Sequence, residues 1–239
     1  MNPTLKALED ESKATRERLR SGTLLDAWRA QSPAGVTLRS DAELDESLAD
    51  MLRSHDTAED MHVFGYGSLM WNPALEYTEV LSARVQGWHR SFCLRQVFGR
   101  GSAQKPGVML ALDRGGACTG RLFRIAATQV EAELRLLWRR EMVGGAYDAR
   151  WVPVLAGDRR LRALTFVINR RHPRYLGGTP VDQIAHLLRT GEGMLGTSRS
   201  YFEALSRTLE SLSIRDAGIE RLRGALSMAE VSEQSLSPG

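Results

Sequence analysis

The stretch HVFGYGSLMWNP, residues 62–73, decides the fold, because a strand-like apolar run ends there in a glycine-rich turn. An apolar run typical of a β-strand stops at the tetrapeptide GYGS, residues 65–68, and apolar side chains resume at residues 69–71 before a proline. Glycines at the end of a strand let the backbone expose consecutive N–H groups, and such a concavity binds an anion such as a carboxylate. The alternative is a plain turn whose residues 69–71 pack in the core.

Three familiar loop motifs do not fit this stretch. A dinucleotide-binding fingerprint needs a third glycine at position 70, where Met70 stands, and a Walker loop needs a Gly-Lys-Ser/Thr sequence that is absent. The nucleophile elbow of a hydrolase needs glycines at positions 66 and 70, which are Tyr66 and Met70. We therefore do not expect Ser68 to be a nucleophile.

The residues before this stretch favour helices, and those after it favour strands. Helices are expected over residues 4–20 and, behind the capping box of Ser40 and Glu43, over residues 41–52, with a loop at residues 32–35. Short apolar runs then predict strands at residues 62–66, 83–86, 90–97, 108–113, 119–125, 151–155 and 161–168.

Helices return within and after the strands. A second capping box at residues 128–131 predicts a helix that Gly144 and Gly145 stop, and three further helices are expected at residues 179–188, 198–212 and 216–226. The order of elements indicates an α+β domain and not a βαβ array. We expect a helical N-terminal extension over residues 1–60, one domain over residues 61–226 and a flexible tail over residues 227–239.

Composition excludes several functional classes. The 239 residues are 42% hydrophobic and carry 32 basic against 29 acidic side chains, so the net charge of +3 does not indicate a nucleic-acid partner. No window has the roughly 18 apolar residues of a membrane-spanning helix, and the N-terminus lacks the apolar core of a signal peptide. Cys93 and Cys118 lie in apolar stretches, which favours buried thiols and a cytoplasmic protein. Neither the five histidines nor the cysteines have metal-ligand spacing, so no metal or cofactor is expected.

One carboxylate interrupts an apolar helix face. Val130, Leu134 and Leu137 share a face of the helix expected after residue 128, and Glu141 follows on that face. Burial near the negative end of the helix dipole would raise the pKa of Glu141 toward neutrality and suit it to proton transfer. The alternative is a Glu141 just past the buried zone, paired with Arg139, Arg140 or a neighbouring strand.

Three further side chains are candidates for ligand contacts. Tyr147 follows the two glycines, and Tyr201 continues the apolar face of Leu205 and Leu209; each is a core aromatic or a phenol at the rim of a site. Arg95 alternates with apolar neighbours and is a candidate contact for an anion.

Together these stretches resemble the ChaC family of glutathione-specific γ-glutamylcyclotransferases, historically named as cation-transport regulators. FGYGSLMWNP at residues 64–73 looks like the family's signature loop, WHRSFCLR at residues 88–95 like its next strand, and REMVGGAY at residues 140–147 like its catalytic segment. GTSRSY at residues 196–201 is similar to its late Arg-x-Tyr element. Phe202 departs from the leucine that usually follows this tyrosine.

The resemblance implies a small mixed β-barrel with surrounding helices and a metal-independent, lyase-type reaction. Such an enzyme converts glutathione to 5-oxoproline and Cys-Gly by attack of the γ-glutamyl α-amine on its own side-chain amide. Glu141 would be the general acid and base. The backbone of Tyr66, Gly67, Ser68 and Leu69 would hold the α-carboxylate, and the remaining candidate contacts would be Arg95, Tyr147 and Tyr201.

Other functions stay open at this point. A cyclotransferase for other γ-glutamyl peptides or amines uses the same chemistry, and a noncatalytic regulator of a cation transporter would fit the older family name. The arginines at 159, 160, 162, 170 and 171 lack interleaved aromatics, so they predict a solvated face and not RNA binding. The sequence leaves the oligomeric state open.

Overall fold

The structure is a computed structural model that describes the backbone of residues 3–236 and the side chains of residues 10–228. The chain divides into two compact units. Unit 1 comprises Met1–His89 and Leu112–His172, and unit 2 comprises Arg90–Ala111 and Pro173–Gly239. The predicted boundaries at residues 60 and 226 follow a different division and stay a prediction.

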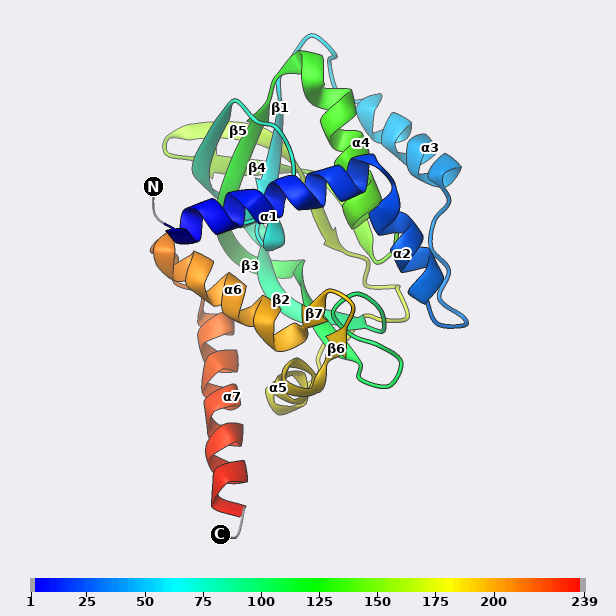
Figure 1. The fold of residues 1–239 in the computed structure, drawn as a ribbon. Helices are drawn as coiled ribbons and strands as arrows, with labels where there is room; N and C mark the ends of the chain where they lie inside the picture. Colours follow the sequence, from blue (N-terminus) through cyan, green and yellow to red (C-terminus); the bar gives the residue numbers. More distant parts are fainter. Residues whose placement is uncertain (1–2, 237–239) are drawn as a thin grey trace. The chain divides into compact units, whose positions relative to one another are not determined.

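Three helices precede the first strand of unit 1. They are α1 (Pro3–Arg20), α2 (Thr23–Gln31) and α3 (Asp41–Leu52), and α1 and α3 both contact the later helix α4 (Figure 1). The capping box is confirmed, because the Ser40 side chain accepts from the Glu43 N–H and the Glu43 side chain accepts from the Ser40 N–H. Helix α2 was not predicted, although Leu24, Leu25 and Trp28 form a buried face on it.

Five strands close into a barrel, and the α+β prediction is confirmed. The order is β1 (Met61–Gly65), β3 (Gly107–Ile125), β2 (Glu79–Gln96), β4 (Tyr147–Ala156) and β5 (Arg159–Ile168). Strand β1 is antiparallel to β3 through the pairs Met61–Ile125 to Gly65–Arg121, and it meets β5 in parallel at Val63–Leu164. The core contains large buried side chains such as Phe64, Phe123 and Phe166.

Two pairs of predicted strands are each one long strand. Residues 83–86 and 90–97 both fall in β2, and residues 108–113 and 119–125 both fall in β3. The predicted breaks are at Gly87 and at Gly115 and Gly116, which have positive φ angles of 79°, 105° and 66°. A left-handed glycine can lie inside a strand, so it did not mark a strand end here.

The helix between the strands forms without the capping box predicted at Thr128. A 3₁₀ turn, η2 (Ala127–Gln129), comes first, and α4 (Val130–Glu141) follows with Gln129 as an N-cap that makes no side-chain hydrogen bond. That prediction was wrong because the chain is already turning at residues 127–129. Helix α4 ends at Glu141, three residues before Gly144, and Gly145 adopts a φ of 66°.

Unit 2 contains the other elements. They are α5 (Val181–Thr190), the short strands β6 (Glu192–Gly193) and β7 (Gly196–Thr197), α6 (Ser198–Ser211) and α7 (Ala217–Leu236). Helix α5 contacts both α6 and α7. Helix α7 continues to Leu236, past the predicted end at residue 226, and residues 237–239 of the predicted tail lie outside the described residues.

Candidate active site

The GYGS stretch is a tight turn between β1 and the 3₁₀ helix η1 (Ser68–Met70). The Met70 N–H donates to the Gly67 carbonyl at 2.8 Å, and the Asn72 N–H donates to the Ser68 carbonyl at 2.8 Å. The first N–H groups of a helix have no acceptor inside it, and Ser68 and Leu69 hold these positions in η1. The helix η1 itself therefore gives no acceptor to these two amides.

The same turn is anchored in the core, as the plain-turn alternative predicted, and binding of an anion by the turn stays a prediction. Leu69, Met70 and Trp71 are all buried, as is Tyr66, whereas Ser68 is half-buried. Space around the strand end is tight: a Cβ on Gly65 would lie 3.0 Å from the Cβ of Leu69, and a Cβ on Gly120 of the neighbouring strand β3 would overlap the Gly65 carbonyl oxygen. The anchored side chains hold the turn in a fixed place.

Glu141 is the last residue of α4, and its side chain is only 16% exposed. Val130, Leu134 and Leu137 are buried on the predicted face of the helix. Burial raises the pKa of the Glu141 carboxyl from its ordinary 4.5, and the neighbouring charge of Arg140 opposes this rise. The structure combines part of each alternative, because the side chain is largely buried and its Oε1 lies 3.1 Å from the Nε of Arg140.

Arg140 connects this carboxyl to the GYGS turn. Its Nη2 donates to the Ser68 hydroxyl at 2.8 Å, and its Nη1 donates to the Asn72 carbonyl at 2.7 Å. The Arg140 side chain is 11% exposed, so these bonds are largely shielded from bulk water. One planar cation therefore fixes the end of α4 against the turn, which places Glu141 and Ser68 on two sides of the same group.

The other three side chains predicted to contact a ligand belong to different elements of the two units. Tyr147 is the first residue of β4, where it pairs with Ile168 and is half-buried. Arg95 and Tyr201 belong to unit 2. Arg95 is exposed, and its N–H donates to the Arg174 carbonyl.

Tyr201 is 3% exposed in unit 2 and contacts the ring of Phe92 edge-on, with ring centroids 6.2 Å apart. The Arg100 guanidinium lies 5.4 Å from the Tyr201 ring centroid. These contacts fit the core-aromatic alternative. Contact of Arg95, Tyr147 and Tyr201 with a ligand stays a prediction.

Sequence reasoning missed the residues that support the turn. It named Arg140 only as a possible partner for Glu141, and it did not consider Asn72, Arg16 or Glu133. A signal existed for Glu133, because it lies three residues after Val130 and four before Leu137, on the apolar face that also led to Glu141. No comparable signal marks Arg16.

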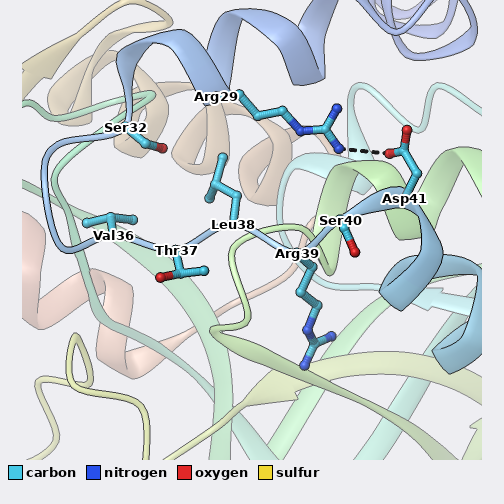
Figure 2. A pocket seen from close by; sticks show the side chains of 8 residues that line it. All are labelled: Arg29, Ser32, Val36, Thr37, Leu38, Arg39, Ser40 and Asp41. Carbon is cyan, nitrogen blue, oxygen red and sulfur yellow. Dashed lines mark hydrogen bonds and ion pairs between the residues drawn. The ribbon is translucent and has the colours of Figure 1, made fainter.

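A surface hollow of about 650 Å³ lies elsewhere in unit 1. Residues 36–41 line it together with Arg29 and Ser32, and Figure 2 shows Arg29 paired with Asp41 while Arg39 extends away from them. None of the predicted site residues lines this hollow. Its segment is tied to the end of α4, since the Arg39 N–H donates to the carbonyl of Val143, two residues after Glu141.

Comparison with known proteins gives the family. The profile of the ChaC-like protein family matches residues 61–228. The chain belongs to the ChaC family. A glutathione-specific γ-glutamylcyclotransferase of Escherichia coli K12 is 44% identical over 177 residues, which are 74% of this chain and 77% of that protein. A human ChaC relative, glutathione-specific γ-glutamylcyclotransferase 1, is 33% identical over 66% of this chain and 73% of its own length.

The ChaC fold is shared with a solved structure. A γ-glutamylcyclotransferase specific to glutathione from yeast superimposes with a TM-score of 0.66 over 71% of this chain and 96% of its own, at 18% identity. Within the part of the ChaC chain that the structure describes, no group of three or more His, Cys, Asp or Glu residues could hold a metal ion. Among the same residues, none of the helices is both long and apolar enough to cross a membrane.

Proposed function

We propose that this protein is a γ-glutamylcyclotransferase that converts glutathione to 5-oxoproline and Cys-Gly. The observation that carries the proposal is the buried Glu141 carboxyl, joined through Arg140 to the GYGS turn. The names of the Escherichia coli and human relatives support glutathione as the substrate. Cys93 and Cys118 are both buried and are not joined in a disulfide, which supports the reducing setting of the cytoplasm.

The proposed reaction is an intramolecular aminolysis. The α-amine of the γ-glutamyl group attacks the side-chain amide carbonyl, a C–N bond forms to close the five-membered ring, and the C–N bond to cysteine breaks. The attacking nitrogen loses a proton and the departing nitrogen gains one, so the reaction is balanced without water or a redox partner. A single carboxyl between the two nitrogens serves first as base and then as acid.

Glu141 is the residue to which we assign both proton transfers. Burial raises the pKa of Glu141 toward neutral pH. The carboxylate then takes up the proton of the attacking amine more readily, and the carboxylic acid can still give a proton to the departing amine. Its position at the end of α4, held by the Arg140 bonds to Ser68 and Asn72, keeps it fixed relative to the turn. Fixed placement of a reacting group supplies much of an enzyme's advantage in a cyclisation.

The turn is assigned the substrate's α-carboxylate. The N–H groups of Ser68 and Leu69 begin η1, and the glycines on either side of Tyr66 allow a ligand to approach the backbone. Tyr147, Tyr201 and Arg95 remain proposed contacts for the rest of the peptide. Stabilisation of the oxyanion of the tetrahedral intermediate is assigned to other backbone amides of this loop, since the two N–H groups at the start of η1 are taken by the carboxylate.

The test is a comparison of wild type with Glu141→Gln in the presence of glutathione. Equimolar 5-oxoproline and Cys-Gly, measured by mass spectrometry, are expected from wild type, and Glu141→Gln should be slower by roughly 10²–10⁴-fold. Glu131→Gln is the matched control, because Glu131 lies on α4 with a side chain that is 74% exposed. Equal rates for wild type and Glu141→Gln would remove Glu141 from the mechanism.

A second set of substrates separates the alternatives. γ-Glu-Ala and γ-glutamyl-amines should react more slowly than glutathione. A faster reaction with either would make the protein a cyclotransferase for other γ-glutamyl compounds. No product from any of them would contradict the proposed chemistry and leave the noncatalytic regulator as the better interpretation.

A further inference from the structure

Helix α1 lies outside the family match, which begins at residue 61, yet its side chains bind the chain just after the GYGS turn. The Ser12 hydroxyl accepts from the Ala74 N–H at 3.0 Å. The Thr15 hydroxyl accepts from the Asn72 side-chain amide at 3.1 Å while donating to the Glu11 carbonyl. These bonds link a helix far away in sequence to the segment that ends the signature loop.

A buried ion pair holds α1 against α4. Arg16 donates from both Nη atoms to the two carboxylate oxygens of Glu133, with 2.6 Å between Nη2 and Oε1. Glu133 is 1% exposed and also accepts from the Glu76 N–H at 2.9 Å. Arg16 in addition lies 3.1 Å from the Glu76 carboxylate. Three segments, α1, α4 and residues 74–76, therefore meet at one carboxylate.

Asn72 is the point at which this network reaches the candidate site. Its side-chain Nδ2 donates to Thr15 of α1, with the Glu11 carboxylate at 3.4 Å. Its backbone carbonyl accepts from Arg140, whose Nε lies beside Glu141. Asn72 is 6% exposed, so water does not readily replace the partners it would lose.

We propose that α1 is a functional part of the enzyme, in which Thr15 and the Arg16–Glu133 pair act through Asn72 and Arg140 to position the Glu141 carboxyl. Thr15, Arg16, Asn72 and Glu133 are positioning residues, because none of them is assigned a contact with substrate. The part of this inference that concerns the positioning of Glu141 for catalysis rests on the proposed function. The structural side, that α1 restrains the turn, stands independently of any substrate.

Arg140 can hold Glu141 in place only if the guanidinium is itself held in place. A guanidinium holds two groups in fixed relation only if its acceptors are themselves fixed, and Arg140 donates to the Ser68 hydroxyl in the turn and to the Asn72 carbonyl just after it. Asn72 is followed by Pro73 and by Ala74, which has a φ of 53°, so the segment is bent and needs outside partners. Thr15, Ser12 and Glu133 are those partners. Loss of them should loosen the turn and the Glu141 carboxyl together.

The experiment uses point variants of the full chain. Thr15→Val removes one hydroxyl and keeps the β-branched shape, and Thr15→Ser restores the hydroxyl. Arg16→Met with Glu133→Gln removes the ion pair without leaving a lone buried charge, and the glutamine oxygen can still accept from Glu76. Ala14→Val is the control, because it places a valine on an exposed position of the same helix.

Two readouts are expected to move together. With glutathione, Thr15→Val and the double variant should lower kcat roughly three- to tenfold with KM little changed, and Thr15→Ser and Ala14→Val should match wild type. Hydrogen–deuterium exchange of the peptide covering residues 66–72 should be faster in the two impaired variants only. Melting temperatures identify any variant that is simply unfolded.

The outcomes separate this inference from the proposed function. Unchanged exchange at residues 66–72 in both impaired variants overturns the inference, whatever the enzyme makes. Faster exchange with unchanged kcat also overturns it, because α1 would then stabilise the turn without positioning Glu141. If wild type makes no product from glutathione, the proposed function fails, and the exchange of residues 66–72 alone decides whether α1 restrains the turn.

Discussion

The Nε of Arg140 lies 3.1 Å from the Oε1 of Glu141, the residue that follows it at the end of α4. The same guanidinium donates to Ser68 and to the carbonyl of Asn72. A planar cation with several donors in fixed directions can hold three separated groups in a set geometry, whereas the donors of a lysine ammonium all leave one nitrogen on a flexible stem. Arg140 is therefore the structural connection between the GYGS turn and the proposed acid and base.

The first prediction concerns that connection. Arg140→Lys should keep the positive charge but lose one or two of the charge-assisted hydrogen bonds, each worth about 1.5–3 kcal/mol. We expect kcat/KM for glutathione to fall roughly 10- to 100-fold. Arg139→Lys is the control, because Arg139 lies on the same helix and donates to the Leu19 carbonyl instead. A rate for Arg140→Lys within about threefold of wild type would contradict the role given to the guanidinium.

The second prediction concerns the pH dependence of activity. Burial raises the pKa of Glu141 above its ordinary 4.5, more than the Arg140 charge lowers it. The free enzyme needs the carboxylate form to accept the first proton, so kcat/KM should fall as pH is lowered through the raised pKa. The midpoint of this acid limb should lie above 4.5, measured with glutathione across the acidic and neutral range. A midpoint at or below that value would count against Glu141 as the base.

The third prediction concerns stability and follows from the same pKa. Between the ordinary and the raised pKa the folded state binds more protons than the unfolded state, so the contribution of Glu141 to stability is full at low pH and is lost as pH rises. Glu141→Gln cannot ionise, and it should be more stable than wild type at neutral pH by on the order of 1–3 kcal/mol. Urea unfolding at several pH values measures this difference.

The advantage of Glu141→Gln should shrink as pH falls toward the ordinary carboxyl pKa, because wild type is then protonated and neutral as well. The exposed Glu131→Gln control should show no such dependence. An advantage that stayed constant with pH would mean that the stability difference has another cause.

Two parts of the candidate site were chosen from local sequence patterns alone. The apolar face of α4 led to Glu141, and the strand end at Gly65 led to the turn, because periodicity and glycine are properties of neighbouring residues. The ion pair of Arg16 with Glu133 joins residues 117 positions apart. A pattern tells which face of a helix is buried, but it does not tell which partner covers that face, so the support from α1 could not be predicted.

The errors in the fold have a similar origin. The breaks predicted at Gly87 and Gly115 were wrong because a glycine with positive φ has the same sequence signature in a turn and inside a strand. Helix α2 was missed because its nine residues begin after Gly22 with no side-chain cap, which gives little local signal. The barrel itself was predicted from the family resemblance, and the family match and the fold confirm that resemblance.

The last prediction concerns unit 2 and its ion pair between Arg90 and Asp216. The Arg90 side chain is 1% exposed, and its Nη1 donates to the Asp216 Oδ2 at 3.1 Å. Asp216 directly precedes α7, and its Oδ1 accepts from the N–H of Gly218 at 3.1 Å, so one carboxylate both neutralises a buried cation and caps a helix.

Asp216→Ala should therefore cost about 3–5 kcal/mol of unfolding free energy, because it removes the carboxylate from a buried arginine. Glu210→Ala is the matched control, since Glu210 pairs with Arg223 at 2.7 Å but its side chain is 61% exposed, and exposed pairs contribute about 0–1 kcal/mol. Urea unfolding of both variants gives the comparison. Equal losses would show that burial of Arg90 does not set the cost, and a loss confined to Asp216→Ala would make this pair the anchor of α7 in unit 2.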